Sequence, residues 1–374
     1  MTTVDLTTVR DSTDWHHFEE IDSLNPSNLL EGYISHRRDN LYGAVFIERV
    51  NHVSVPQLII ATPKMGYPFD QHGNWHFPKA KQIWSYVKYD GTNACAFWYL
   101  DGKGFPYVTV KTRLRPMMLN SRFGPFLDMW NTLMERHPEL RELPRHLHMN
   151  ISYEIYGSSN QHLIHYDTPL ALALLFVRKD GYIYPPHAIE ALAPYRDHFA
   201  AFNARITRDY VQSYKASQIT LEDNLVETDN GFTGDEGAVW YLQTEDDIWT
   251  PWKCKSPTIE FIHWSAGGLG KLQIRAAVFK AFENWDEPSL ANVISILEED
   301  YDPRIVFEHA AQIQTALDVE YAQIYFKQHV MSLYNALEMS ILDDKGAVMR
   351  ALSGHFHRSD MTKVFSTIWN EVTR

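Results

Sequence analysis

Cysteine is nearly absent from this chain of 374 residues, which contains only Cys95 and Cys254. Two cysteines cannot build a disulfide framework or a cysteine-based zinc site. Uncharged apolar runs of about 18 residues, the length that crosses a bilayer, are also missing, so no membrane span is expected. The segment from Met1 to Trp15 lacks the basic and apolar parts of a signal peptide. We therefore expect a cytoplasmic protein.

An excess of positive charge is missing as well, because 34 lysines and arginines face 47 aspartates and glutamates, for a net charge of −13. This excludes a uniformly basic nucleic-acid coat but not a local basic groove. Residues 281–374 contribute −8 of that charge. One stretch is rich in cations and free of acids, and we predict that it forms a polynucleotide path flanked by Tyr107 and Phe123: Lys103, Lys111, Arg113, Arg115 and Arg122.

Repeats and low-complexity segments are absent too, and a hydrophobic fraction of 45% is typical of a globular protein. Alternating and β-branched segments predict strands over much of residues 42–62, 83–113, 149–157 and 171–180, with a helix over 125–136. We also predict a helical region over 187–215 and strands over 237–243 and 258–263. The stretch KLQIRAAVFKAF could be a strand or a helix.

From about residue 285 the pattern becomes helical, and Pro288 stands where a helix would begin. We find no strand pattern beyond that point. The sequence therefore predicts an α+β fold with two domains, residues 1–280 and an all-helical C-terminal domain over 281–374.

Lys88 begins the segment Lys-Tyr-Asp-Gly-Thr-Asn, directly after a strand-like IWSYV. By itself this pattern is weak, because Asp-Gly is a common hairpin turn. A lysine amine in this place could also attack the α-phosphate of a nucleotide and hold it as a phosphoramidate. The amine would first have to be neutral, which burial, nearby cations or a metal can achieve. That chemistry predicts further lysines and a metal-binding carboxylate elsewhere in the chain.

Such residues follow in order. Glu154 lies in YEIYG, Phe176 in LALLFV and Glu236 at the start of EGAVW, and Lys253 and Lys255 flank Cys254 in WKCK. On a strand, the two-residue period puts both lysines on one face, where they could clamp a phosphate. Cys254 would then face the core.

The ordered set resembles the covalent nucleotidyltransferase superfamily, which contains ATP-dependent RNA and DNA ligases and mRNA capping guanylyltransferases. KYDGTN resembles motif I, KTR at 111–113 motif Ia, EIYG motif III, LLFV motif IIIa, EGAVW motif IV and KCK motif V. The similarity spans about residues 60–260. Val87 departs from the pattern, since many relatives carry glutamate there, which leaves the details of adenine recognition open.

Three features resemble RNA ligases of the phage and fungal tRNA-ligase kind in particular. These are the pairing of EGAVW with KCK, the lead-in ATPKMGYPF, and a helical tail in place of the β-rich OB domain of the other branches. The resemblance implies a nucleotidyltransferase core of antiparallel sheets with helices, like that of ATP-grasp ligases. It also suggests a phage or viral source, for which the location would be the host cytoplasm.

The resemblance implies an ATP-dependent RNA ligase that joins a 5′-phosphate to a 3′-OH through a lysyl-AMP on Lys88 and an AMP-capped RNA end. It implies ATP with Mg²⁺ or Mn²⁺ as cofactors and RNA as the partner, and we expect a monomer. Whether the RNA is single-stranded, nicked or a broken tRNA stays open. A DNA ligase, a capping guanylyltransferase and a non-catalytic nucleotide- or RNA-binding module are the alternatives.

The resemblance also assigns roles to individual residues. Lys253 and Lys255 would hold the α-phosphate, and Glu236 would orient the metal. Glu154 would bind the ribose and Phe176 would stack on adenine, although a phenylalanine in an apolar run is as often part of the core. The remaining candidates are Asp90, Gly91 and Asn93 in the nucleophile loop, Arg113 on a phosphate, and Lys64 near the ATP leaving group, where an exposed loop lysine is an equal alternative.

Three histidine pairs could suggest a metal site: His146/His148, His162/His165 and His355/His357. No cysteine or acid completes any of them at a recognisable spacing. Because the chain has 18 histidines, we interpret these pairs as coincidence.

Overall fold

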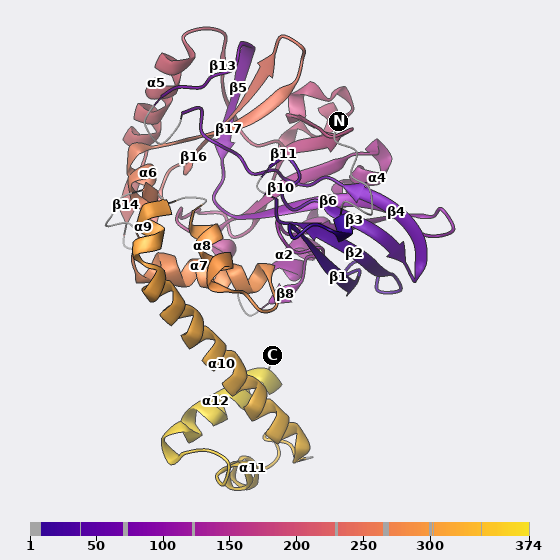
Figure 1. Ribbon diagram of the computed structural model, residues 1–374, viewed down its shortest axis with the longest axis vertical. Helices are drawn as coiled ribbons and strands as arrows, with labels where there is room; N and C mark the ends of the chain where they lie inside the picture. The colour runs from indigo at the N-terminus through magenta and orange to yellow at the C-terminus, as the bar shows by residue number, and fades with distance from the viewer. Residues whose placement is uncertain are drawn as a thin grey trace. The chain divides into compact units, whose positions relative to one another are not determined.

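The computed structural model describes residues 9–37, 39–69, 74–121, 124–228, 231–264, 269–298, 301, 303–337 and 339–373. The chain divides into two compact units. The first comprises Met1–Gly268 and Phe282–Glu287, and the second comprises Leu269–Ala281 and Pro288–Arg374. Figure 1 colours the chain from indigo to yellow, so that the last helices of the second unit are yellow.

A nine-stranded sheet forms the centre of the first unit. Its pairings are antiparallel. In their order across the sheet the strands are β13 (Phe202–Ile206), β5 (Ala80–Lys88), β16 (Gly237–Thr244), β17 (Trp249–Lys255), β12 (Tyr182–Tyr184), β11 (Ala171–Lys179), β10 (Asn150–Tyr156), β6 (Thr92–Leu100) and β7 (Pro106–Lys111).

Side chains of this sheet alternate between two faces, and both faces are buried along its central strands. In β16, Tyr241 packs in a cluster with Phe176, which we call the inner face. The neighbouring Trp240 packs in a different cluster with Cys254, which we call the outer face. This double burial explains why β16 and β11 consist of nearly continuous apolar residues.

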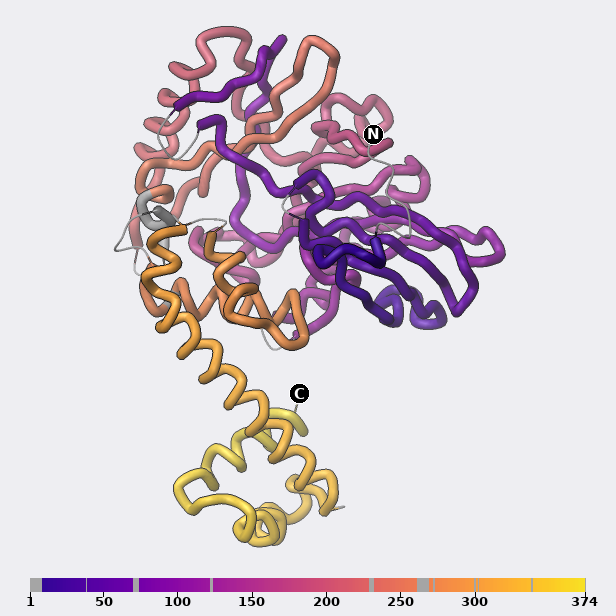
Figure 2. The backbone as a smooth tube through the Cα atoms, viewed as in Figure 1, coloured from indigo at the N-terminus to yellow at the C-terminus, as the bar shows by residue number. Residues whose placement is uncertain are grey.

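The main sheet is strongly curved. Strands β5 and β6 are joined by only three residues, yet they occupy the second and eighth places in the sheet. Six inter-strand steps of about 4.8 Å would separate them by about 29 Å in a flat sheet. The four-residue step from Lys88 to Thr92 reaches at most about 14 Å. The sheet therefore curls so that its second and eighth strands come together, and Figure 2 traces the chain from one to the other in purple.

A second, four-stranded sheet precedes the main one and shares a core cluster with β6 through Ile47 and Phe97. Its strands are β1 (Trp15–Ile21), β2 (Leu29–Ser35), β3 (Val45–Val50) and β4 (Val53–Ile59). The sequence predicts β3 and β4 but not β1 and β2. In β1 only Trp15 and Phe18 are buried, three residues apart, so the strand lacks the two-residue period that identifies a strand.

Helices cover the outer face of the main sheet. The predicted helix over 125–136 is confirmed as α2, whose Trp130 packs edge-on against Tyr153 of β10 at 5.7 Å. The helical segments of the first unit are α2 (Phe126–Arg136), α3 (Pro138–Arg141), α4 (Leu143–Leu147), η1 (Ser158–Asn160), η2 (Pro186–Ala188), η3 (Glu190–His198), α5 (Tyr210–Asp223) and α6 (Pro257–Trp264). Two short two-stranded pairs complete it: β8 (Asn120–Ser121) with β9 (Gly124–Pro125), and β14 (Val226–Thr228) with β15 (Gly231–Thr233).

Two of the predicted segments are wrong. The strand predicted over 258–263 is helix α6, because the Ser256 side chain accepts a hydrogen bond from the Ile259 N–H and Pro257 occupies the first helical position. The strand that pairs with β16 is instead β17, which contains the KCK segment. Residues 187–215 are not uniformly helical either, because β13 lies among them and exists through its pairing with β5.

The second unit is helical in its described residues. Helix α7 (Lys271–Asn284) resolves the ambiguous KLQIRAAVFKAF stretch and runs from the second unit into the first. It is followed by α8 (Leu290–Leu297), α9 (Pro303–Glu308), α10 (Ala310–Ala336), α11 (Lys345–Leu352), η4 (Arg358–Asp360) and α12 (Met361–Val372). Val330, Val364 and Ile368 belong to its buried cluster. The α+β class and the helical C-terminal region are thereby confirmed. Among the described helices, none combines the length and the apolar character needed to cross a membrane.

Candidate active site

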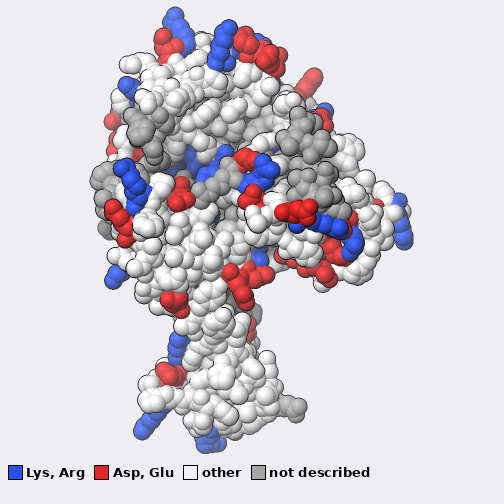
Figure 3. All heavy atoms as spheres, viewed as in Figure 1, with Lys and Arg blue, Asp and Glu red and all other residues white. Residues whose placement is uncertain are grey.

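Two lysines and a glutamate meet at one end of three neighbouring strands. Lys88 ends β5, Glu236 directly precedes β16 and Lys255 ends β17. The Lys88 and Lys255 ammonium groups each pair with a different oxygen of the Glu236 carboxylate, and Lys255 Nζ lies 3.0 Å from Oε1. The Lys255 and Glu236 side chains are only 2% and 6% exposed. Figure 3 shows lysine and arginine atoms within a hollow on the visible face of the first unit.

The strand register explains why these groups meet. Gly237 pairs with Lys88 on one side and with Lys255 on the other, so both lysines flank the same point of β16. A side chain at Gly237 would put its Cβ 2.3 Å from the carbonyl oxygen of Cys254. Only glycine allows β16 and β17 to approach this closely beside the ion pairs.

Glu236 carries a full negative charge in spite of its burial. Burial alone would raise the pKa of this carboxyl, but Lys88 and Lys255 together lower it to about 2. A carboxylate held ionised among two cations is suited to binding a metal ion or to positioning an amine.

Glu154 belongs to the same surroundings but behaves differently. It lies on β10 opposite Asn93 and Ala173, on the inner face. Burial raises the pKa of Glu154 to about 7; Lys88 acts against this rise, and Glu236 and Asp90 add to it. Within the described residues its side chain makes no hydrogen bond or ion pair, so the carboxyl is available to a ligand.

The turn after Lys88 is fastened from two sides. Asp90 Oδ2 accepts hydrogen bonds from the N–H groups of Leu163 at 2.5 Å and Ile164 at 2.7 Å. A Cβ at Gly91 would lie 2.1 Å from the carbonyl oxygen of Ile155, so glycine is required there. The turn thereby holds Lys88 against β10 and the segment that follows it. Burial and the charge of Glu236 raise the pKa of Asp90.

Asn93 is tied to β10. Its amide nitrogen donates to Ser152 Oγ at 2.9 Å and to the Tyr153 carbonyl at 3.0 Å. Its place in the structure is therefore a link between β6 and β10, next to Glu154.

Lys253 lies on the same face as Lys255, two residues before it, and Cys254 is fully buried on the outer face. This alternation is the one that the sequence predicts. The segment of Lys64 reaches this place too, because the Lys253 N–H donates to the Gly66 carbonyl at 2.9 Å. Lys253 also lies 5.8 Å from the Tyr67 ring centroid.

Arg113 is half-buried beside the segment that leads to Lys64. Its guanidinium donates to the Pro63 carbonyl at 3.2 Å and lies 5.1 Å from the Tyr42 ring centroid. Arg113 is close enough to Glu154 to lower the pKa of that carboxyl by a minor amount. The charge of Arg113 therefore acts on Glu154, as the charge of Lys88 does.

Phe176 lies in the core. Its side chain is 1% exposed and packs in the inner-face cluster with Tyr86, Tyr241 and Trp249. In this structure the ring therefore presents no accessible face to a nucleotide.

Three tyrosines beside the site were not anticipated from the sequence. Tyr89 stacks on Tyr156 with ring centroids 4.2 Å apart, and Tyr166 contacts Tyr156 edge-on at 5.1 Å. The Tyr166 hydroxyl accepts a hydrogen bond from the Asp90 N–H at 2.8 Å. Tyr89 belongs to the motif KYDGTN and Tyr156 to EIYG, but nothing in the sequence indicates that their rings are in contact.

The predicted polynucleotide path is wrong for Lys111. This residue is fully buried, its ammonium donates to the carbonyls of Thr112 and Arg113 at 2.6 and 2.9 Å, and burial lowers its pKa to about 8. Arg115 pairs with Asp286 at 2.8 Å, and Tyr107 packs beside Tyr99. Arg122 and Phe123 lie outside the described residues. Because Lys111 is buried, the described part of this stretch does not form a continuous basic surface.

Comparison with known proteins gives only distant similarity. No family model matches the chain, and no curated protein matches it in sequence. Among solved structures, an archaeal ATP-dependent RNA ligase is 15% identical with a TM-score of 0.47, over 87% of this chain and 77% of its own. A Naegleria gruberi RNA ligase variant with ATP and Mn is 14% identical with a TM-score of 0.35, over 48% of this chain and 50% of its own. Similarity at this level does not assign the chain to a family.

Proposed function

We propose that this chain is an ATP-dependent RNA ligase that joins a 5′-phosphate to a 3′-OH through a lysyl-AMP on Lys88. The observation that carries the proposal is the buried group of Lys88, Glu236 and Lys255, next to Glu154. Three of these residues lie in strands β5, β17 and β10, and Glu236 directly precedes β16; they belong to the motifs KYDGTN, KCK, EIYG and EGAVW. The catalytic part would be the first unit, and the helical region would serve substrate selection.

The first step would be attack of Lys88 Nζ on the α-phosphorus of ATP. A bond forms between Nζ and phosphorus, the bond to the bridging oxygen breaks, pyrophosphate leaves and Nζ loses a proton. Lys253 and Lys255 would neutralise the α-phosphate oxygens, and Lys64 would lie near the leaving group. Since displacement at phosphorus depends mainly on positioning and charge neutralisation, a fixed lysine set is the main requirement.

The nucleotide would be held beside this group. Glu154, with its pKa near 7, can both donate to and accept from a ribose hydroxyl. Arg113 would contact a phosphate. The turn of Asp90 and Gly91, anchored on the Ile155–Ile164 stretch, would keep Lys88 in line.

In the second step an oxygen of the RNA 5′-phosphate would displace Lys88 from the adenylyl phosphorus. In the third step the RNA 3′-OH would attack the phosphorus of the capped end, AMP would leave and the 3′–5′ bond would form. Lys88 returns to its amine form after the second step, so one site serves all three displacements.

Mg²⁺ or Mn²⁺ fits the donor set, since both ions prefer oxygen ligands and Glu236 stays ionised. Glu236 would hold the ion once Lys88 leaves the carboxylate to attack. When bound, such an ion would neutralise charge on the phosphates.

The test is incubation of the full chain with α-labelled ATP and Mg²⁺, followed by denaturation. We expect one labelled adduct per chain, which Lys88→Ala abolishes and which the surface variant Lys179→Ala retains. An adduct that survives Lys88→Ala, or no adduct with the native chain, would refute the proposal.

A second experiment identifies the polynucleotide. The labelled enzyme is offered single-stranded RNA, nicked duplex RNA and nicked DNA, each with a 5′-phosphate. Sealing of RNA ends at a higher rate than DNA ends is expected. Labelling from GTP in place of ATP would instead indicate a capping guanylyltransferase, and sealing of DNA alone would indicate a DNA ligase.

A further inference from the structure

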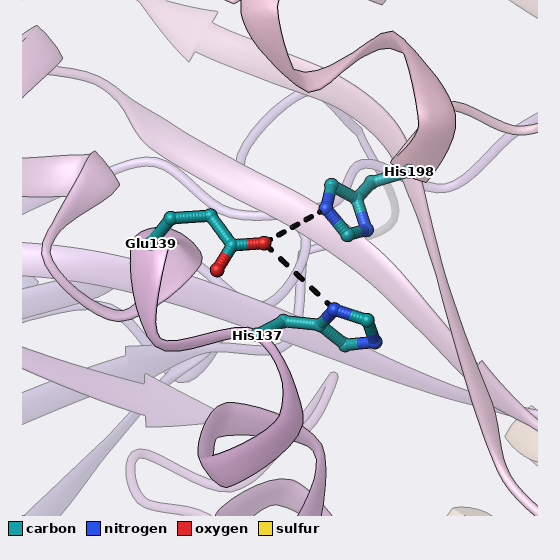
Figure 4. A group of neighbouring side chains, drawn as sticks. All are labelled: His137, Glu139 and His198. Atoms are coloured by element: carbon teal, nitrogen blue, oxygen red, sulfur yellow. Dashed lines mark hydrogen bonds and ion pairs between the residues drawn. The ribbon is translucent and has the colours of Figure 1, made fainter.

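A group of three metal-ligating side chains lies apart from the candidate active site (Figure 4). His137 separates α2 from α3, Glu139 lies in the first turn of α3, and His198 ends η3. His198 Nε2 is 3.0 Å and His137 Nδ1 is 3.8 Å from the same oxygen, Glu139 Oε1. Within the described ranges no other three side chains of this kind come as close together.

The spacing of the three ligand atoms suits one small ion. All three lie within 4.8 Å of one another. In a tetrahedral zinc site with bonds of about 2.1 Å, neighbouring ligand atoms stand about 3.4 Å apart. The two measured distances bracket that value, so small rotations of the side chains bring the three atoms onto one centre.

The imidazole rings of His137 and His198 lie next to each other. The centroids of His137 and His198 are 4.7 Å apart and the rings meet edge-on, with their planes at 74°. One carboxylate with two imidazoles is a common ligand set for zinc.

We propose that His137, Glu139 and His198 bind a borderline transition-metal ion, Zn²⁺ in the first instance, with water in the fourth position. Two histidine nitrogens favour Zn²⁺ over Mg²⁺, which prefers oxygen ligands. None of the three histidine pairs apparent in the sequence takes part. The ligands are 59 residues apart between Glu139 and His198, so the site forms only in the folded chain.

The site fastens a segment that reaches β5. Two residues after His198, the Ala200 N–H donates to the Leu174 carbonyl at 2.9 Å. The Ala201 carbonyl next accepts a hydrogen bond from the Val87 N–H at 2.8 Å, beside Lys88. A metal between α3 and η3 therefore fixes the start of a segment that ends against the strand of Lys88, and the role is structural rather than catalytic.

The experiment titrates the chelator-stripped full chain with Zn²⁺ in excess Mg²⁺, which keeps oxygen-only sites filled. Bound zinc is measured after gel filtration, and Co²⁺ absorption reports tetrahedral geometry. We expect about one Zn²⁺ per native chain and a rise in melting temperature. His137→Ala and Glu139→Gln should each weaken binding by at least about tenfold. His146→Ala, an exposed histidine of α4, should bind like the native chain.

Two outcomes would overturn the proposal: a native chain that retains no zinc, and a double variant His137→Ala/His198→Ala that retains as much zinc as the native chain. X-ray absorption on the zinc-loaded native chain gives an independent answer if a variant fails to fold. Two imidazoles and one carboxylate around the ion support the site, and any other ligand set excludes it.

Discussion

Glu154 and Glu236 lie near the same lysine, yet their protonation is opposite. Glu236 pairs directly with two ammonium groups, which hold its pKa near 2. Glu154 is half-buried and makes no such pair, and loss of solvation raises its pKa to about 7. The difference shows that a direct contact with a cation outweighs burial, whereas a more distant cation does not.

The two glutamates should therefore change stability with pH in opposite directions. Glu154 contributes its full share of stability below pH 4.5, the pKa of a glutamate in the unfolded chain. This share is lost as the pH rises through 7. Between pH 4.5 and 7, the free energy of unfolding of Glu154→Gln should therefore rise relative to that of the native chain, by up to about 3 kcal/mol. Chemical denaturation at pH 4.5 and pH 8 measures this difference. An equal effect of the substitution at both values would contradict the assignment.

Glu236 should behave in the reverse way. Its contribution is complete above pH 4.5 and is lost as the pH falls through 2. Glu236→Gln should be less stable than the native chain at pH 7 by about 3 kcal/mol, because two buried ammonium groups lose their partner. Chemical denaturation at pH 7 and pH 3 measures the difference in free energy of unfolding between the native chain and Glu236→Gln. We expect this difference to be smaller at pH 3. A larger difference at pH 3 would show that the ion pairs of Glu236 do not stabilise the fold.

Phe176 offers a separate test of packing against nucleotide stacking. Because its side chain is buried, Phe176→Ala should cost about 3–5 kcal/mol of stability, whereas Phe176→Leu should cost less than about 1.5 kcal/mol. If the ring is purely core, Phe176→Leu leaves the affinity for ATP unchanged in calorimetric titration. A loss of affinity with intact stability would instead show that the ring contacts adenine.

At the residue scale, the sequence suggests which residues form the candidate site but not which of them are in contact. Lys88, Glu236 and Lys255 can be selected because their spacing and order are unusual. That Glu236 lies between both lysines could not be deduced, since it depends on the register of Gly237 with two strands. The tyrosines around Asp90 were hidden for the same reason, because Tyr166 lies 76 residues from Asp90 along the chain.

The turn between β5 and β6 positions Lys88, the proposed nucleophile, and its geometry depends on Gly91. Gly91→Ala would drive a methyl group into the Ile155 carbonyl and push the turn away from β10. We expect a loss of adduct formation with ATP of about 100-fold and a loss of stability of about 1–3 kcal/mol. Gly354→Ala is the matched control, because nothing lies within 4 Å of its added Cβ. Equal adduct yields from both variants would show that the turn tolerates displacement.

Elements with a strong local pattern were predictable. The strands β5, β6, β10 and β16 follow from alternation or from runs of strand-forming residues, and the helix α2 follows from helical spacing. Elements defined by a distant partner were not: β13 is exposed over four of its five residues and is a strand only because β5 pairs with it. Helix α6 was mistaken for a strand because its isoleucines and phenylalanine suit a strand, although Ser256 and Pro257 mark a helix start.

At the scale of the whole molecule, two compact units with separate cores should unfold separately. Ile368 is fully buried in the cluster of the second unit, and Ile368→Ala should cost about 2–5 kcal/mol. Calorimetry of Ile368→Ala should show two unfolding transitions, of which only one lies at a lower temperature than in the native chain. At temperatures below both transitions, the variant should still form the adduct with ATP. Asn370→Ala, at an exposed position of α12, is the control. A single transition that shifts as a whole would mean that the units unfold together.

The place of β5 in the main sheet has a consequence for synthesis on the ribosome. Both of its neighbours, β13 and β16, are translated later, and Gly237 emerges roughly 150 residues after Lys88. At about 5–20 residues per second, the strand IWSYV waits about 6–23 s for β13, its first partner, and about 8–30 s for β16. During that time an apolar strand with two open edges is exposed to other chains. Slow or arrested translation between residues 90 and 240 should therefore favour aggregation of the nascent chain. A chaperone that binds this strand would prevent aggregation until β13 and β16 have been translated and the candidate site can form.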